Sequence, residues 1–109
     1  MAADRRLSKK IYPKDINVRK LCKLNEERDQ LTKDIDKFFI IMKSNGFRPG
    51  IDAQNPIFFK DFDLINICEK RRERIIKQIS RIESFSGISV EDALHQFYIL
   101  NKGRGSQSF

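Results

Sequence analysis

Residues 21–42, LCKLNEERDQLTKDIDKFFIIM, decide the fold, because mostly apolar side chains recur in them at alternating steps of three and four residues. Steps of this kind keep one stripe on one side of an α-helix. Asp15 is suited to cap the start of this helix, and Gly46 can end it in a left-handed conformation. We therefore predict a helix over residues 15–45. Its stripe comprises Leu21, Leu24, Arg28, Leu31, Ile35, Phe38 and Met42.

A second stripe with the same rhythm follows after a connecting segment. The sequence SFSG at 84–87 interrupts it, which predicts a helix over residues 61–84. Two stripes of similar length with a connection between them predict a long antiparallel, coiled-coil-like helical hairpin. The second stripe comprises Ile65, Cys68, Arg72, Ile75, Ile79 and Ile82.

Arg28 and Arg72 occupy stripe positions that otherwise hold mostly apolar residues. A charged side chain in such a seam destabilises the pair of helices unless it is paired or reaches water. The hairpin register places Arg72 opposite the turn that holds Asp34 and Asp36, which could accept its hydrogen bonds. Extension of the aliphatic stem to water is the alternative for both arginines.

The two ends of the chain complete an all-α prediction. Ser89 is a good N-cap for a short third helix over residues 89–102, which folds against the hairpin and is closed by Gly103. Residues 1–14 lack periodicity and predict a flexible basic arm. Residues 103–109, rich in Gly and Ser, predict a disordered tail, so residues 15–102 form a single helical domain.

Basic charge is concentrated in two segments of a chain whose net charge is +7. Residues 1–14 have a net charge of +4 and residues 70–81 a net charge of +5, so the remainder of the chain is slightly acidic. On a helix, the second segment forms a basic face that can meet nucleic acid, an acidic protein surface or only solvent. The residues of this face are Lys70, Arg71, Arg74, Lys77 and Arg81.

The connection between the two long helices is unusually apolar, as NPIFFKDFDL at 55–64 illustrates. A two-helix end does not need that many large apolar side chains, so part of the cluster is expected to meet another chain. Whether each residue belongs to the core or to an interface stays open at this stage. The predicted docking residues are Phe47, Ile57, Phe58, Phe59 and Phe62.

Residues suited to catalysis or metal binding are few. The single histidine, His95, and the two cysteines, Cys22 and Cys68, do not follow a metal-binding or nucleophile–base spacing. Glycine-rich phosphate-binding motifs are absent, and no apolar run is long enough to span a membrane. We therefore expect no enzyme activity, no metal, no cofactor, no small-molecule substrate and no membrane association.

One resemblance concerns the order of elements around FFKDFDL at 58–64. A long helix, a glycine-containing loop, this motif and a second long helix resemble the helical N-terminal domain of a PDZ-containing proteasome-assembly chaperone, over residues 18–82 at most. The sequence lacks that family's Tyr-Pro-Arg before the Asp-x-Asp-Leu and contains no PDZ domain. It is therefore not assigned to the family.

The function expected from these features is that of a non-enzymatic adaptor. The chain would be a small subunit of an intracellular assembly of proteins, or of proteins and nucleic acid, with the nucleus favoured over the cytoplasm. The loop aromatics and an exposed helical seam would dock a protein partner. The alternative is a direct, sequence-nonspecific DNA- or RNA-binding protein that uses the basic face.

Overall fold

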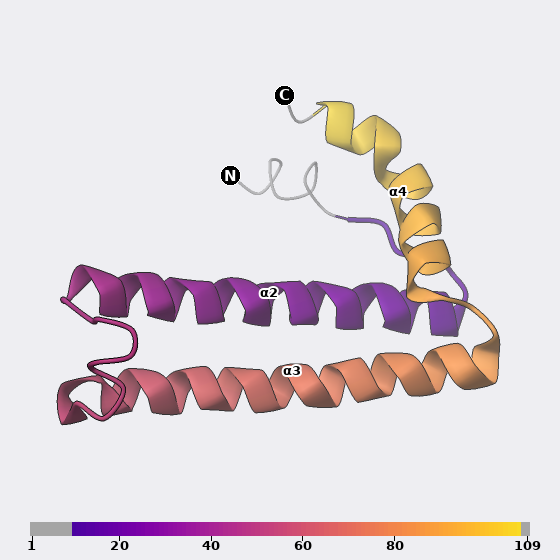
Figure 1. Ribbon diagram of the computed structural model, residues 1–109. Coiled ribbons are helices and arrows are strands. Elements are labelled where there is room, and N and C mark those ends of the chain that lie inside the picture. The colour runs from indigo at the N-terminus through magenta and orange to yellow at the C-terminus, as the bar shows by residue number, and fades with distance from the viewer. Residues whose placement is uncertain (1–9, 108–109) are drawn as a thin grey trace. The chain divides into compact units, whose positions relative to one another are not determined.

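The computed structural model describes the backbone of residues 10–107 and the side chains of residues 10–102. Within this range the chain forms three α-helices and one short 3₁₀ helix, so the all-α prediction is confirmed (Figure 1). The elements are α2 (Ile16–Ser44), η1 (Pro56–Phe58), α3 (Phe59–Ser86) and α4 (Val90–Gln107). No helix in the described part of the chain is long and apolar enough to cross a membrane.

The chain divides into two compact units that share the two long helices. Unit 2 is Glu26–Lys77 and contains the C-terminal part of α2, the connecting loop and the N-terminal part of α3. Unit 1 contains the described residues before Glu26 and after Lys77, and therefore includes α4. Each unit is described by itself below.

The caps predicted for α2 are present at both ends. Asp15 accepts hydrogen bonds from the main-chain N–H groups of Asn17 and Val18, at 2.9 and 3.1 Å. At the other end, Gly46 has a φ of 89°, and Phe47 donates its N–H to the Met42 carbonyl at 3.0 Å. This bond and the one from Gly46 to the carbonyl of Lys43 form a Schellman motif. The glycine therefore ends the helix and turns the chain into the loop.

Helix α3 begins earlier than predicted, because Asn55 and Pro56 form a start signal that the prediction did not use. Asn55 Oδ1 accepts the N–H of Ile57 at 3.2 Å, and proline fits the first helical position, which needs no N–H donor. Gly87, with a φ of 72°, follows the end of α3, as the SFSG sequence predicts.

Helix α4 has the predicted N-cap but a different end. Ser89 Oγ accepts the N–H of Asp92 at 3.1 Å, while the Glu83 carboxylate accepts the N–H of Val90 at 2.8 Å. The helix continues past the predicted end at residue 102 and ends at Gln107. A glycine inside a helix lowers the stability of that helix by about 1 kcal/mol relative to alanine, but it removes no hydrogen bond. A helix can therefore continue through a glycine.

Unit 2 is an antiparallel hairpin whose core lies at the loop end (Figure 1). Ile35 and Met42 of α2 form a buried cluster with Phe58 and with Ile65 of α3. Four half-buried residues pack against this cluster, namely Phe38, Phe47, Phe62 and Cys68. The predicted stripes therefore meet each other in this unit, and the expectation that the seam stays exposed for a partner is wrong.

Arg72 lies at the seam of this hairpin without the expected carboxylate partner. Its guanidinium donates to Thr32 Oγ1 at 3.2 Å, and Thr32 in turn donates to the carbonyl of Arg28 at 3.1 Å. Asp34 instead accepts a hydrogen bond from Gln30 on its own helix, at 3.0 Å. A neutral hydroxyl and partial exposure therefore satisfy the seam arginine.

Unit 1 buries the first turns of α2, the last turns of α3 and the start of α4. Its buried apolar residues are Val18, Leu21, Cys22, Ile79, Ile82 and Ala93. The Cys22 thiol donates to the carbonyl of Ala93 at 3.4 Å, which links α2 to α4. Cys22 and Cys68 are both thiols rather than a disulfide.

Part of the predicted flexible arm has a defined place in unit 1. Ile11 forms main-chain hydrogen bonds with the side chain of Asn101, and the ring of Tyr12 lies 5.3 Å from that of Phe97. These residues therefore have contacts with α4, far along the chain, that the sequence did not indicate. The remainder of the arm, residues 1–9, lies outside the described residues.

Candidate protein-docking face

Three loop-region phenylalanines close the end of the unit 2 hairpin. Phe58 is only 4% exposed, and its ring lies 5.0 Å from that of Phe47 at an angle of 84°. Phe47 meets Phe62 at 5.6 Å in a similar edge-to-face arrangement. Such pairs add about 0.5–1.5 kcal/mol each beyond their burial. These rings are therefore part of the core, and the docking role predicted for Phe58 is wrong.

An ion pair inside the loop holds the backbone that carries these rings. Asp52 Oδ2 accepts the main-chain N–H of Arg48 at 2.7 Å and its Nε–H at 3.1 Å. The Asp52 N–H in turn donates to the Arg48 carbonyl at 2.9 Å. The hydrogen bond from the Arg48 guanidinium holds the pKa of Asp52 below its ordinary value of 3.8. The loop is thus a closed turn with its own polar centre.

Outside this closed core, many large apolar side chains of unit 2 remain in contact with solvent, including Phe39, Ile40, Ile41, Ile51, Leu64 and Ile76. Three more lie on or next to one side of α3. Ile57 is 75% exposed, Phe59 45% and Ile67 52%. Phe59 also lines an open hollow of about 370 Å³ with Ala53, Phe62 and Asp63. Residues 59, 63 and 67 are four apart on one helix, so they share one side of α3. We call this side, with the neighbouring Ile57, the α3 outer face.

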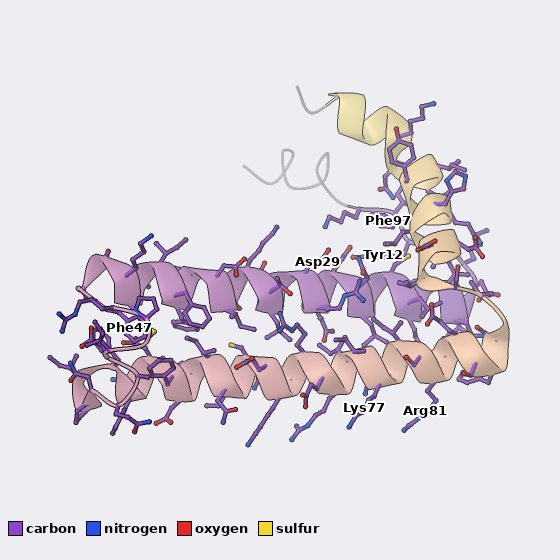
Figure 2. All side chains as sticks on the ribbon, viewed as in Figure 1. Tyr12, Asp29, Phe47, Lys77, Arg81 and Phe97 are labelled. Carbon is purple, nitrogen blue, oxygen red and sulfur yellow. The ribbon has the colours of Figure 1, made fainter. Side chains whose placement is uncertain are left out.

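The basic residues continue the same side of α3 toward its C-terminus. Lys70, Arg74 and Lys77 follow Ile67 at steps of three, four and three, and Arg71 lies beside them. All four are exposed, and no described side chain pairs with them by an ion pair. Figure 2 shows Lys77 projecting from the helix away from its buried side. Arg81 is also exposed, although it belongs to unit 1.

The predicted site residues therefore separate into two groups. Ile57 and Phe59 lie on the surface next to the basic residues, whereas Phe47, Phe58 and Phe62 form or support the core. Ile67 was not predicted as part of the site. Its position between Asp63 and Lys70 on the polar side of the helix was the available signal, because an apolar residue there cannot reach the seam.

The remaining candidates for chemistry stay apart. His95 lies exposed on α4, and Cys22 is buried in unit 1. Among the described residues, no three His, Cys, Asp or Glu side chains gather in a way that could hold a metal ion.

The comparisons with known proteins add no relative. No protein-family model, no curated protein and no solved structure matches this chain.

Proposed function

We propose that this protein is a small, non-enzymatic helical adaptor that docks a protein partner on the α3 outer face. The observation that carries this proposal is that three exposed apolar side chains, an open hollow and a row of exposed cations lie along one side of α3. Ile57, Phe59 and Ile67 are 75%, 45% and 52% exposed although Phe58, beside them in sequence, is buried. Exposed aromatic and aliphatic side chains grouped on one face are common anchors of protein interfaces.

The neighbouring charges indicate what kind of partner fits this face. The hollow beside Phe59 can receive an apolar side chain, and Lys70 lies about 16 Å further along the helix, at ~1.5 Å per residue. A partner helix with an apolar anchor followed by acidic residues would match both features. Exposed ion pairs of this kind contribute little affinity individually, but a row of them steers association and sets orientation.

Direct binding of nucleic acid is the second candidate, and the row of exposed cations favours it. Lys70, Arg74 and Lys77 could each contact a phosphate, which gives an affinity that falls with salt. A phosphate-binding surface does not require Ile57, Phe59 or Ile67, however. The apolar half of the face is therefore the reason to place the adaptor first.

Two sets of substitutions separate these candidates. A triple variant, Ile57→Ser with Phe59→Ser and Ile67→Ser, should abolish capture of a stoichiometric protein partner and retain helix content by circular dichroism. The matched control is Phe85→Ser with Ile99→Ser, which removes exposed apolar side chains of unit 1. Equal capture by the triple variant and the control would contradict the proposed face.

The second set replaces Lys70, Arg74, Lys77 and Arg81 with glutamine. For a nucleic-acid-binding protein, the slope of log affinity against log salt should become shallower by roughly 3–4 units on duplex DNA. For the adaptor, the protein partner should associate more slowly but still bind. Failure of the wild-type chain to bind nucleic acid at low salt would remove the second candidate.

A further inference from the structure

The side chain of Asn101 in unit 1 pairs with the main chain of residue 11 as a neighbouring strand would. Asn101 Oδ1 accepts the N–H of Ile11 at 2.8 Å, and Asn101 Nδ2 donates to the Ile11 carbonyl at 2.7 Å. Paired residues in an antiparallel sheet exchange the same two bonds. Asn101 therefore recognises an extended main chain, whatever the side chain at that position.

The helix that carries Asn101 fixes the orientation of this amide. Asn101 Nδ2 also donates to the carbonyl of Phe97, one turn earlier in α4, at 2.8 Å. That bond lies within the helix and does not depend on residue 11. The amide is thus held in its pairing orientation before a segment binds, which reduces the entropy lost on binding.

The next residue of the segment, Tyr12, is recognised as an aromatic ring. Its centroid lies 5.3 Å from that of Phe97, and Lys23 Nζ stands 5.1 Å from the centre of the tyrosine ring. Figure 2 shows Tyr12 beside Phe97, with one ring from the segment and the other from α4. An aromatic neighbour and a cation over the ring favour any electron-rich aromatic side chain at this position.

The third residue, Pro13, is buried, and its carbonyl accepts the Nε–H of Arg19 at 3.3 Å. Proline has no N–H group, so its burial leaves no main-chain donor unsatisfied. The contacts at positions 11–13 therefore describe a pattern of any residue, an aromatic residue and a proline. Residues 10–13, which we call the N-terminal strap, belong to neither a helix nor a strand.

We propose that α4 and the first turns of α2 form a binding site for an extended aromatic–proline segment of a partner protein. The N-terminal strap is the occupant that the chain supplies itself. Its release would break no helix or strand hydrogen bond, and Asn101 and Phe97 would keep their places on α4. This inference concerns unit 1 and does not depend on the docking face proposed for unit 2.

Charge argues that a partner segment can displace the strap. The site contains two cations, Arg19 and Lys23, and the strap's own C-terminal flank is Lys14, a third cation. A segment with the same aromatic–proline core and acidic flanks would add electrostatic attraction to Arg19 and Lys23 that Lys14 does not supply. We therefore expect the partner segment to be acidic on either side of its core.

The test uses the full chain with Tyr12→Ala, which empties the ring site, and a fluorescent peptide Glu-Ile-Tyr-Pro-Glu. Fluorescence anisotropy should show saturable binding to this variant. Binding to the wild-type chain should be about tenfold weaker, since the strap occupies the site for most of the time. A peptide with lysine in place of both glutamates should bind several-fold more weakly.

Two controls keep the result specific to the contacts described. Asn101→Asp, introduced beside Tyr12→Ala, keeps an acceptor for the peptide N–H but removes the donor for its carbonyl, so binding should be lost with helix content unchanged. A peptide with alanine in place of tyrosine should not bind, which tests the ring site without altering the protein. Absence of saturable binding to the Tyr12→Ala chain, or equal binding of the alanine peptide, would overturn the proposal.

Discussion

The connecting loop of unit 2 and the N-terminal strap of unit 1 both cover apolar parts of the molecule, but they are held in different ways. The loop joins α2 to α3, buries Phe58, and is tied internally by Arg48 and Asp52. The strap is followed by α2, has no described element before it, and lies on α4 through the side chains of Asn101 and Phe97.

This difference indicates which surface can exchange its occupant. Removing the loop from its place would expose the buried ring of Phe58, so the loop opens only with the core beneath it. Removing the strap exposes the half-buried ring of Tyr12 and the buried Pro13, and it frees the hydrogen-bonding groups of Asn101 and Arg19, which water can then satisfy. A segment that fills a core is thus a fixed part of the fold, whereas a segment held by a few side chains of α2 and α4 can be replaced.

The largest expected effect comes from charge placed in the unit 1 core. Ile79→Asp should unfold the protein, because a buried, unpaired carboxylate costs more than about 4 kcal/mol. Lys77→Ala, two residues away on the exposed side, should change the free energy of unfolding by less than about 0.5 kcal/mol. Thermal unfolding followed by circular dichroism measures both. Equal shifts would mean that the sides of α3 are assigned wrongly.

A smaller effect is expected from truncating the ring that the loop buries. Phe58→Ala should lower the free energy of unfolding by about 3–5 kcal/mol, through lost burial and a remaining cavity. Phe59→Ala removes a neighbouring ring that is largely exposed and should cost less than about 1 kcal/mol. Denaturant titration separates the two. Similar losses of unfolding free energy in the two variants would show that the loop does not bury Phe58 and expose Phe59 as described.

The smallest effect concerns the ion pair within the loop. The pKa of Asp52 is lower in the folded chain than its ordinary value of 3.8, because Arg48 donates hydrogen bonds to it. The carboxylate therefore stabilises the fold above that pH, and its contribution is lost as the pH falls through the folded pKa. The difference in denaturation midpoint between wild type and Asp52→Asn should accordingly narrow below about pH 4. A difference in midpoint that stays constant from about pH 6 to about pH 3 would contradict the pairing.

Much of the fold could be predicted from local patterns. The alternating steps of three and four residues place Ile35, Met42 and Ile65 in the core. Asp15 and Ser89 cap the starts of α2 and α4 with their side chains, and Gly46 ends α2 with a positive φ. These signals operate within a few residues of the chain, so the sequence carries them directly.

The candidate site was less predictable, because burial in a loop follows no period. Phe58 and Phe59 are adjacent and chemically identical, yet the turn set by Asn55 and Pro56 directs only the first into the core. The strap depends on contacts between residues about ninety apart in sequence. No local pattern around Tyr12 indicates which distant ring it will meet.

Hydrogen exchange of individual main-chain amides in the full chain tests the contrast between loop and strap most directly. The Phe47 N–H, bonded to the Met42 carbonyl, should exchange only when the unit 2 core opens. The Ile11 N–H, bonded to the Asn101 side chain, should exchange through local release of the strap, at a free energy of about 1–2 kcal/mol. Protection of Ile11 equal to that of Phe47 would contradict the account, since the strap would then be as fixed as the loop.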